Sequence, residues 1–135
     1  TDYARNLGKT DIVVIEKRRP ADDETEVVKI AGDVAGKNLI IVDDVVQTGR
    51  TLMTAAAAIK KEGAADIYAA VTHFVYSAGA LEFLSEDQNF KKIFITNSIP
   101  VPPGKTLSAK FEVLPIQEML ALATKPLLAQ TVPRK

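Results

Sequence analysis

NLIIVDDVVQTGRTL, residues 38–52, joins a continuous apolar run to a short polar loop and then to an amphipathic stretch. Residues 38–42 have the composition expected of a strand buried on both faces of a parallel sheet. Apolar side chains recur at i, i+3, i+4 and i+7 within residues 51–62, which predicts a helix. The segment is therefore a strand–loop–helix unit, with the adjacent carboxylates Asp43 and Asp44 at the carboxyl end of the strand.

The loop at residues 47–51 has the parts of a phosphate site. The start of the following helix offers unpaired backbone N–H groups and the positive end of the helix dipole. The hydroxyls of Thr48 and Thr51 can add hydrogen bonds, and Gly49 lets the backbone turn tightly and approach a ligand. A phosphate group on this loop is the expected ligand.

Asp43 and Asp44 suit a different part of that ligand. Carboxylates accept hydrogen bonds and repel phosphate, so their natural partners are sugar hydroxyls, with Mg²⁺ able to lie between them. The unit is interpreted as a site for a phosphorylated sugar, and it matches neither the GxxxxGK[ST] loop nor the GxGxxG turn. The alternative interpretation is a solvated turn in which an Asp caps the helix.

The rest of the chain alternates strand-like and helix-like stretches, which predicts an α/β fold with a parallel sheet flanked by helices. Ligands of such sheets bind outside the carboxyl ends of the strands. Residues 17–26 are charged, contain Pro20 and are expected to form a mobile loop. The expected strands are residues 11–16, 27–30, 38–42, 66–74, 92–96 and 111–114, and the expected helices are residues 51–62, 78–86 and 115–123, with residues 1–8 as the end of another.

Composition excludes several classes of protein. The chain has 135 residues, 17 basic and 17 acidic, and 47% apolar side chains, which suits one globular domain and disfavours nucleic-acid or membrane-surface binding. It has no Cys and one His, so zinc–thiolate sites, thiolate nucleophiles and His clusters are impossible. No apolar run reaches the roughly 18 residues of a membrane span, and the start lacks a signal-peptide pattern, so we expect a cytoplasmic protein.

Residues 42–51 resemble the ribose-5-phosphate loop of type I phosphoribosyltransferases and ribose-phosphate diphosphokinases (phosphoribosyl pyrophosphate synthetases). Three further regions resemble the diphosphokinases in particular. KRRP at residues 17–20 is similar to the start of their catalytic flexible loop, and GDVAGK at residues 32–37 to the turn before the loop strand. TH at residues 72–73 and TNSIP at residues 96–100 are similar to their later strand ends.

The resemblance implies that ATP transfers its β,γ-diphosphoryl group to the C1 hydroxyl of ribose 5-phosphate with Mg²⁺, in nucleotide biosynthesis. It implies catalytic roles for Lys17 and Arg19, which would stabilise negative charge during the transfer. It implies that Asp43, and Asp44 beside it, bind the ribose hydroxyls. The residues it implies for the 5′-phosphate are Gln47, Thr48, Gly49, Arg50 and Thr51.

The resemblance has departures. Gln47 stands where the diphosphokinases commonly have Asp, Arg50 where they have a small residue, and Phe74 where they have Gly. Gln47 resembles a divergent, plant-type branch, and Arg50 resembles the loop of pyrimidine regulatory phosphoribosyltransferases. A phosphoribosyltransferase and a non-catalytic regulatory relative therefore stay open as alternatives.

Members of the diphosphokinase family have two similar domains. Residues 1–135 are expected to be the C-terminal, phosphoribosyltransferase-like domain of such an enzyme, without its N-terminal domain. The resemblance implies that the missing domain supplies much of the ATP and metal site, so this chain alone is expected to be inactive. We expect the intact protein to be a homo-oligomer.

Overall fold

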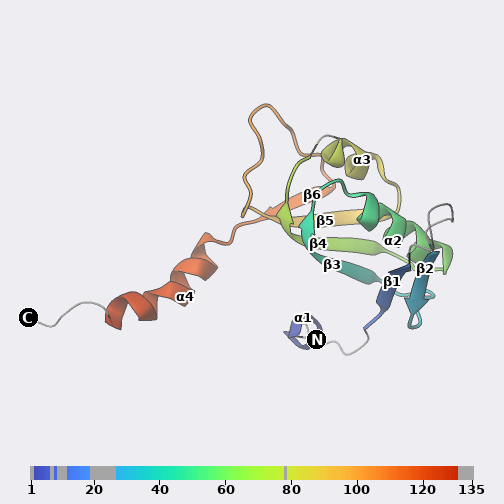
Figure 1. Ribbon diagram of the computed structural model, residues 1–135, viewed down its shortest axis with the longest axis horizontal. Helices are drawn as coiled ribbons and strands as arrows, with labels where there is room; N and C mark the ends of the chain where they lie inside the picture. Colours follow the sequence, from blue (N-terminus) through green and yellow to red (C-terminus); the bar gives the residue numbers. More distant parts are fainter. Residues whose placement is uncertain (1, 7, 9–11, 19–26, 78, 131–135) are drawn as a thin grey trace, which may run out of the picture.

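A four-stranded parallel sheet forms the centre of the computed structural model, which describes residues 2–6, 8, 12–18, 27–77 and 79–130 (Figure 1). Its strands lie in the order β3 (Leu39–Val46), β4 (Ile67–Phe74), β5 (Phe90–Thr96) and β6 (Phe111–Leu114). Each strand is therefore next to its neighbour in the sequence, and every step across the sheet runs in the same direction. The predicted α/β architecture with a parallel sheet is confirmed.

Helices α2 (Arg50–Lys61) and α3 (Ala80–Glu86) connect β3 to β4 and β4 to β5. Parallel connections are almost always right-handed, so two steps in the same direction place both helices on the same face of the sheet. Figure 1 shows them together on that face. Between β5 and β6 the chain forms a loop over residues 97–110 instead of a helix.

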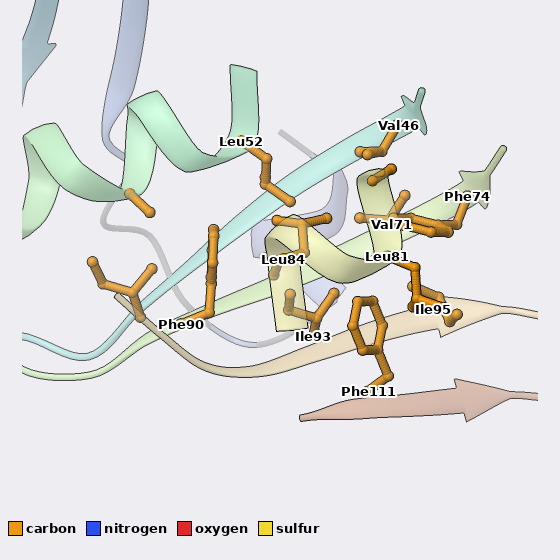
Figure 2. Close-up of a cluster of buried hydrophobic side chains, with 14 of the residues drawn as sticks. Val46, Leu52, Val71, Phe74, Leu81, Leu84, Phe90, Ile93, Ile95 and Phe111 are labelled. Atoms are coloured by element: carbon orange, nitrogen blue, oxygen red, sulfur yellow. The ribbon is translucent and has the colours of Figure 1, made fainter. Parts of the chain in front are cut away.

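The core lies between these two helices and the sheet. Figure 2 shows side chains from α2, α3 and the strands converging in this layer. Burying a Leu, Ile or Phe side chain contributes roughly 1.5–3 kcal/mol, so this layer stabilises the position of both helices. Its fully buried large side chains are Leu52, Ile59, Ile67, Phe74, Leu84, Ile93 and Ile95.

The other face of β3 differs from the prediction that this strand is buried on both sides. Ile40 is 40% exposed and Val42 49% exposed, whereas Leu39 and Ile41 pack against the core. An unbroken apolar run does not show which face of a strand the helices cover. Only the alternation seen in the structure reveals that the α2 and α3 layer covers one face.

A second sheet is an antiparallel hairpin of β1 (Val14–Arg18) and β2 (Val27–Ala31). The predicted loop at residues 17–26 is wrong at its start, because Lys17 pairs with Val28 and Arg18 with Val27. Backbone pairing with two β-branched residues extends the strand through charged positions that the composition assigned to a loop. Residues 19–26 lie outside the described part of the chain.

The remaining helices are α1 (Asp2–Asn6) and α4 (Gln117–Gln130). The prediction that a helix begins at Pro115 is wrong: α4 begins two residues later and continues past Pro126. Figure 1 shows α4 projecting away from the sheet. None of the helices described is long and apolar enough to cross a membrane.

Candidate functional site

The carboxylate pair lies inside β3 and not just after it. The predicted strand ended at residue 42, but β3 continues through Asp43, Asp44 and Val45 to Val46. Parallel pairing with β4 extends the strand, since Val45 pairs with His73 and Val46 with Phe74. The loop that follows is consequently shorter than expected, because α2 begins at Arg50.

A pocket of about 350 Å³ opens where β3, the loop and α2 meet. Its wall contains five of the seven residues predicted to bind substrate. Asp44 and Arg50 do not line it, and both are exposed. The lining residues are Asp43, Val45, Val46, Gln47, Thr48, Gly49, Thr51 and Leu52.

The start of α2 forms one end of this pocket. Its N-cap residue is Gly49, and no side chain in the described structure caps the helix. The Asp cap that belonged to the alternative interpretation, a solvated turn, is therefore wrong. The N–H groups of the first helical turn, which point out of the helix end, have no side-chain oxygen competing with a ligand for them.

Gly49 is required for two independent reasons. Its φ of +75° lies in the left-handed region, and a Cβ built there would lie 2.9 Å from Cδ1 of Leu84. Leu84 is fully buried on α3, so it has little room to move. Helix α3 therefore packs against the loop through Leu84.

The segment that connects β4 to α3 is hydrogen-bonded to the end of β3 and to the loop. The N–H of Val75 donates to the carbonyl of Val46 at 2.9 Å, and the Ser77 hydroxyl donates to the carbonyl of Gln47. Between these two contacts Tyr76 adopts a φ of +55°, an uncommon conformation for a residue other than Gly. Sequence reasoning missed Ser77 and Leu84, because neither belongs to the motif nor lies near it in the chain.

Asp43 is a partly buried carboxylate in the wall of the pocket. Burial, and after it the neighbouring charge of Asp44, raises the pKa of Asp43 above its ordinary value. The carboxylate of Asp44 accepts a hydrogen bond from the N–H of Val45 at 2.9 Å. Mg²⁺ is often held by one or two carboxylates together with substrate phosphate, and Asp43 is the carboxylate of this pair that lines the pocket. The residues described contain no group of three or more His, Cys, Asp or Glu that could enclose a metal alone.

The predicted catalytic residues are not brought to this pocket by the described structure. The backbone of Lys17 lies in β1, opposite Val28. Arg19 lies outside the described residues. The catalytic roles of Lys17 and Arg19 therefore stay predictions.

A parallel sheet with a strand–loop–helix pocket at the carboxyl end of one strand is the arrangement in which α/β domains commonly bind phosphate groups. The chain belongs to the family described as the phosphoribosyl synthetase-associated domain, which it matches over residues 10–131. This match confirms the resemblance to the phosphoribosyl pyrophosphate synthetases.

Three relatives named ribose-phosphate pyrophosphokinase support the same family. The chain is 37% identical to the protein from Gloeobacter violaceus, over 90% of this chain and 36% of that protein. It is 40% identical to the one from Pasteurella multocida, over 90% of this chain and 38% of that protein. It is 37% identical to the one from Bacillus caldolyticus, over 97% of this chain and 39% of that protein.

The fold is similar to a solved structure. The crystal structure of phosphoribosylpyrophosphate synthetase from Mycobacterium smegmatis matches with a TM-score of 0.82 and 29% identity, over 96% of this chain and 40% of that one. The chain thus spans well under half the length of these relatives.

Proposed function

We propose that this chain is the sugar-phosphate domain of a ribose-phosphate diphosphokinase, and that its pocket binds ribose 5-phosphate. The observation that carries the proposal is the pocket itself, in which the uncapped start of α2 and the carboxylate of Asp43 share one wall. The relatives named ribose-phosphate pyrophosphokinase support this choice.

The phosphate of the substrate would occupy the α2 end of the pocket. The N–H groups of the loop and first helical turn, with the hydroxyls of Thr48 and Thr51, would donate hydrogen bonds to its oxygens. Gln47 carries no charge, and Arg50 next to the pocket is positive, so neither repels a phosphate. The departures in the loop are therefore compatible with phosphate binding.

The sugar would lie toward Asp43. Its hydroxyls would donate to the carboxylate of Asp43, whose pKa is raised by burial and by the neighbouring charge of Asp44. Mg²⁺, when bound, would be held by Asp43 and Asp44 with substrate oxygens and would neutralise negative charge.

In the proposed reaction the C1 hydroxyl oxygen attacks the β-phosphorus of ATP. The bond from that phosphorus to the bridging α–β oxygen breaks, AMP leaves and the hydroxyl proton is lost. Catalysis of this kind rests on positioning and charge stabilisation. Lys17 and Arg19 are proposed to supply positive charge, and ATP is proposed to be held together with a further domain in a larger, homo-oligomeric enzyme.

Titration calorimetry of the chain with ribose 5-phosphate tests this proposal. Losing a hydrogen bond to a charged group costs about 1.5–3 kcal/mol, so Thr48→Ala is expected to weaken binding roughly 10- to 150-fold. Thr106→Ala, on the exposed loop between β5 and β6, is the matched control and is expected to bind normally. Equal affinity of both variants and the wild type would reject the pocket as the phosphate site.

A further inference from the structure

Beside the pocket, the carboxyl ends of β4 and β5 carry a closed hydrogen-bond network. Nδ1 of His73 lies 2.8 Å from Oγ of Ser98, and that Oγ lies 2.8 Å from the carbonyl oxygen of Thr72. The same carbonyl accepts from the hydroxyl of Thr96 at 2.6 Å, which accepts from the N–H of Ser98 at 3.1 Å. His73 is the single histidine of the chain.

The network determines where the imidazole proton lies. The carbonyl of Thr72 can only accept, so the one hydrogen of the Ser98 hydroxyl points toward it. Oγ of Ser98 is then left as the acceptor for His73, and Nδ1 of His73 must be the donor. The hydrogen bond at one ring nitrogen sets the tautomer, so a neutral His73 carries its proton on Nδ1.

Nε2 of His73 is therefore left as a hydrogen-bond acceptor. The side chain is exposed, at the edge of the sheet where ligands of such folds bind. Ser98 is the residue that holds the ring in this orientation, since it accepts the Nδ1 proton.

His73 is also next to the pocket. In the parallel pairing of β3 with β4 it lies directly beside Val45, which lines the pocket. Neighbouring strands lie about 4.8 Å apart, so the backbone of His73 is one strand spacing from the wall of the pocket.

We propose that Nε2 of His73 accepts a hydrogen bond from a hydroxyl of the sugar whose phosphate lies on the 47–51 loop, with Ser98 as its positioning residue; this rests on the proposed function of the pocket. A hydroxyl is the fitting partner, because a neutral imidazole nitrogen without a proton cannot donate to a phosphate. Asp43 on β3 is an acceptor of the same kind, so the sugar end of the site is rich in acceptors and the phosphate end is rich in donors.

The tautomer can be measured without any ligand. Nitrogen-15 NMR of the histidine-labelled chain, at a pH where the imidazole is neutral, gives one unambiguous pair of ring signals. We expect the Nδ1–H form in the wild type, a shift toward Nε2–H in Ser98→Ala, and recovery in Ser98→Thr, which keeps the hydroxyl. An Nε2–H form in the wild type overturns the proposal.

Two probes separate this proposal from the one on which it rests. Losing one hydrogen bond is expected to make His73→Ala bind ribose 5-phosphate about 3- to 10-fold more weakly, with inorganic phosphate bound as in the wild type. Thr48→Ala is expected to weaken both ligands. His73→Gln, which keeps a side-chain acceptor, is expected to retain more affinity than His73→Ala and serves if that variant unfolds.

The possible failures are distinguishable. If Thr48→Ala weakens both ligands and neither His73 variant changes sugar-phosphate binding, the role of His73 is rejected and the phosphate site stands. If His73→Ala weakens both ligands equally, the residue acts on the loop or on phosphate and the sugar contact is rejected. If the wild type binds neither ligand, the proposed function itself fails, and the sugar contact fails with it.

Discussion

Gly49 and Leu84 are in contact so close that the loop has no room for a side chain. A Cβ on Gly49 would lie 2.9 Å from Cδ1 and 3.0 Å from Cγ of Leu84. The loop that lines the pocket therefore packs closely against helix α3. The shape of the pocket depends on the packing of α3 as well as on its own sequence.

Gly49→Ala is expected to reduce the free energy of unfolding and to weaken sugar-phosphate binding. A left-handed φ costs a residue other than Gly about 1–2 kcal/mol, and displacement of the buried Leu84 adds to this cost. Urea denaturation measures the first effect and calorimetric titration the second.

Gly104→Ala is the matched control for this variant. Gly104 has a similar φ of +78°, but an added Cβ meets nothing within 4 Å. It is expected to show the conformational cost alone and normal binding. Adding Leu84→Ala to Gly49→Ala is expected to give a less than additive loss of stability, because the contact is then absent; additive losses would contradict the clash.

Asp43→Asn is expected to stabilise the ligand-free chain while weakening ligand binding. Because burial raises the pKa of Asp43, its ionisation destabilises the folded state. This cost is absent below the ordinary carboxyl pKa, where Asp43 is protonated in both states. It grows as the pH rises and is complete above the raised pKa of the folded state.

The test is urea denaturation of the wild type and Asp43→Asn at acidic and neutral pH. The variant is expected to be more stable at neutral pH, with the difference decreasing toward acidic pH. Asp33→Asn is the control of opposite sign, because hydrogen bonds to Lys37 and the N–H of Ala35 lower the pKa of Asp33. A loss of stability in Asp43→Asn at neutral pH would contradict the unfavourable burial of this carboxylate.

Much of the architecture could be predicted because local patterns determine it. The spacing of Leu52 to Ile59 indicated α2, and the alternation of strands and helices indicated a parallel sheet, which the structure confirms. The ends of strands were less predictable, because pairing with the neighbouring strand determines where they lie. Pairing with β4 carries β3 on to Val46, and pairing with β2 draws Lys17 into β1.

The sequence predicted the motif residues that line the pocket, but not the residues from other segments that hold the loop and His73 in place. Five motif residues line one pocket because they are close together in the chain. Leu84 and Ser77 are each 25 or more residues away in the chain from the loop residue that they contact, and Ser98 is 25 residues away from His73. No local pattern in the sequence marks these contacts. Such contacts depend on which strand ends become neighbours in the folded sheet.

Ser77→Ala is expected to loosen the pocket with little effect on the rest of the fold. Removing its hydrogen bond to the Gln47 carbonyl is expected to cost about 0.5–1.5 kcal/mol of stability and to weaken ribose 5-phosphate binding. Ser77→Thr, which keeps a hydroxyl, is expected to restore binding. Ser85→Ala on α3 is a control away from the loop, and equal affinity of Ser77→Ala and Ser85→Ala would contradict the role of Ser77 in holding the loop.

The 135-residue chain is expected to bind ribose 5-phosphate and to release no AMP from ATP. Ligand pockets are typically about 300–1,000 Å³, and the pocket here is about 350 Å³, a size that suits one sugar phosphate. Holding both reactants in line contributes up to about 7–11 kcal/mol to such a transfer, and a domain that holds only one loses most of that contribution. A coupled assay for AMP release tests this, with the full-length Bacillus caldolyticus relative as positive control. AMP formation by this chain that depends on ribose 5-phosphate, and is lost in Thr48→Ala, would show that the chain carries its own nucleotide site.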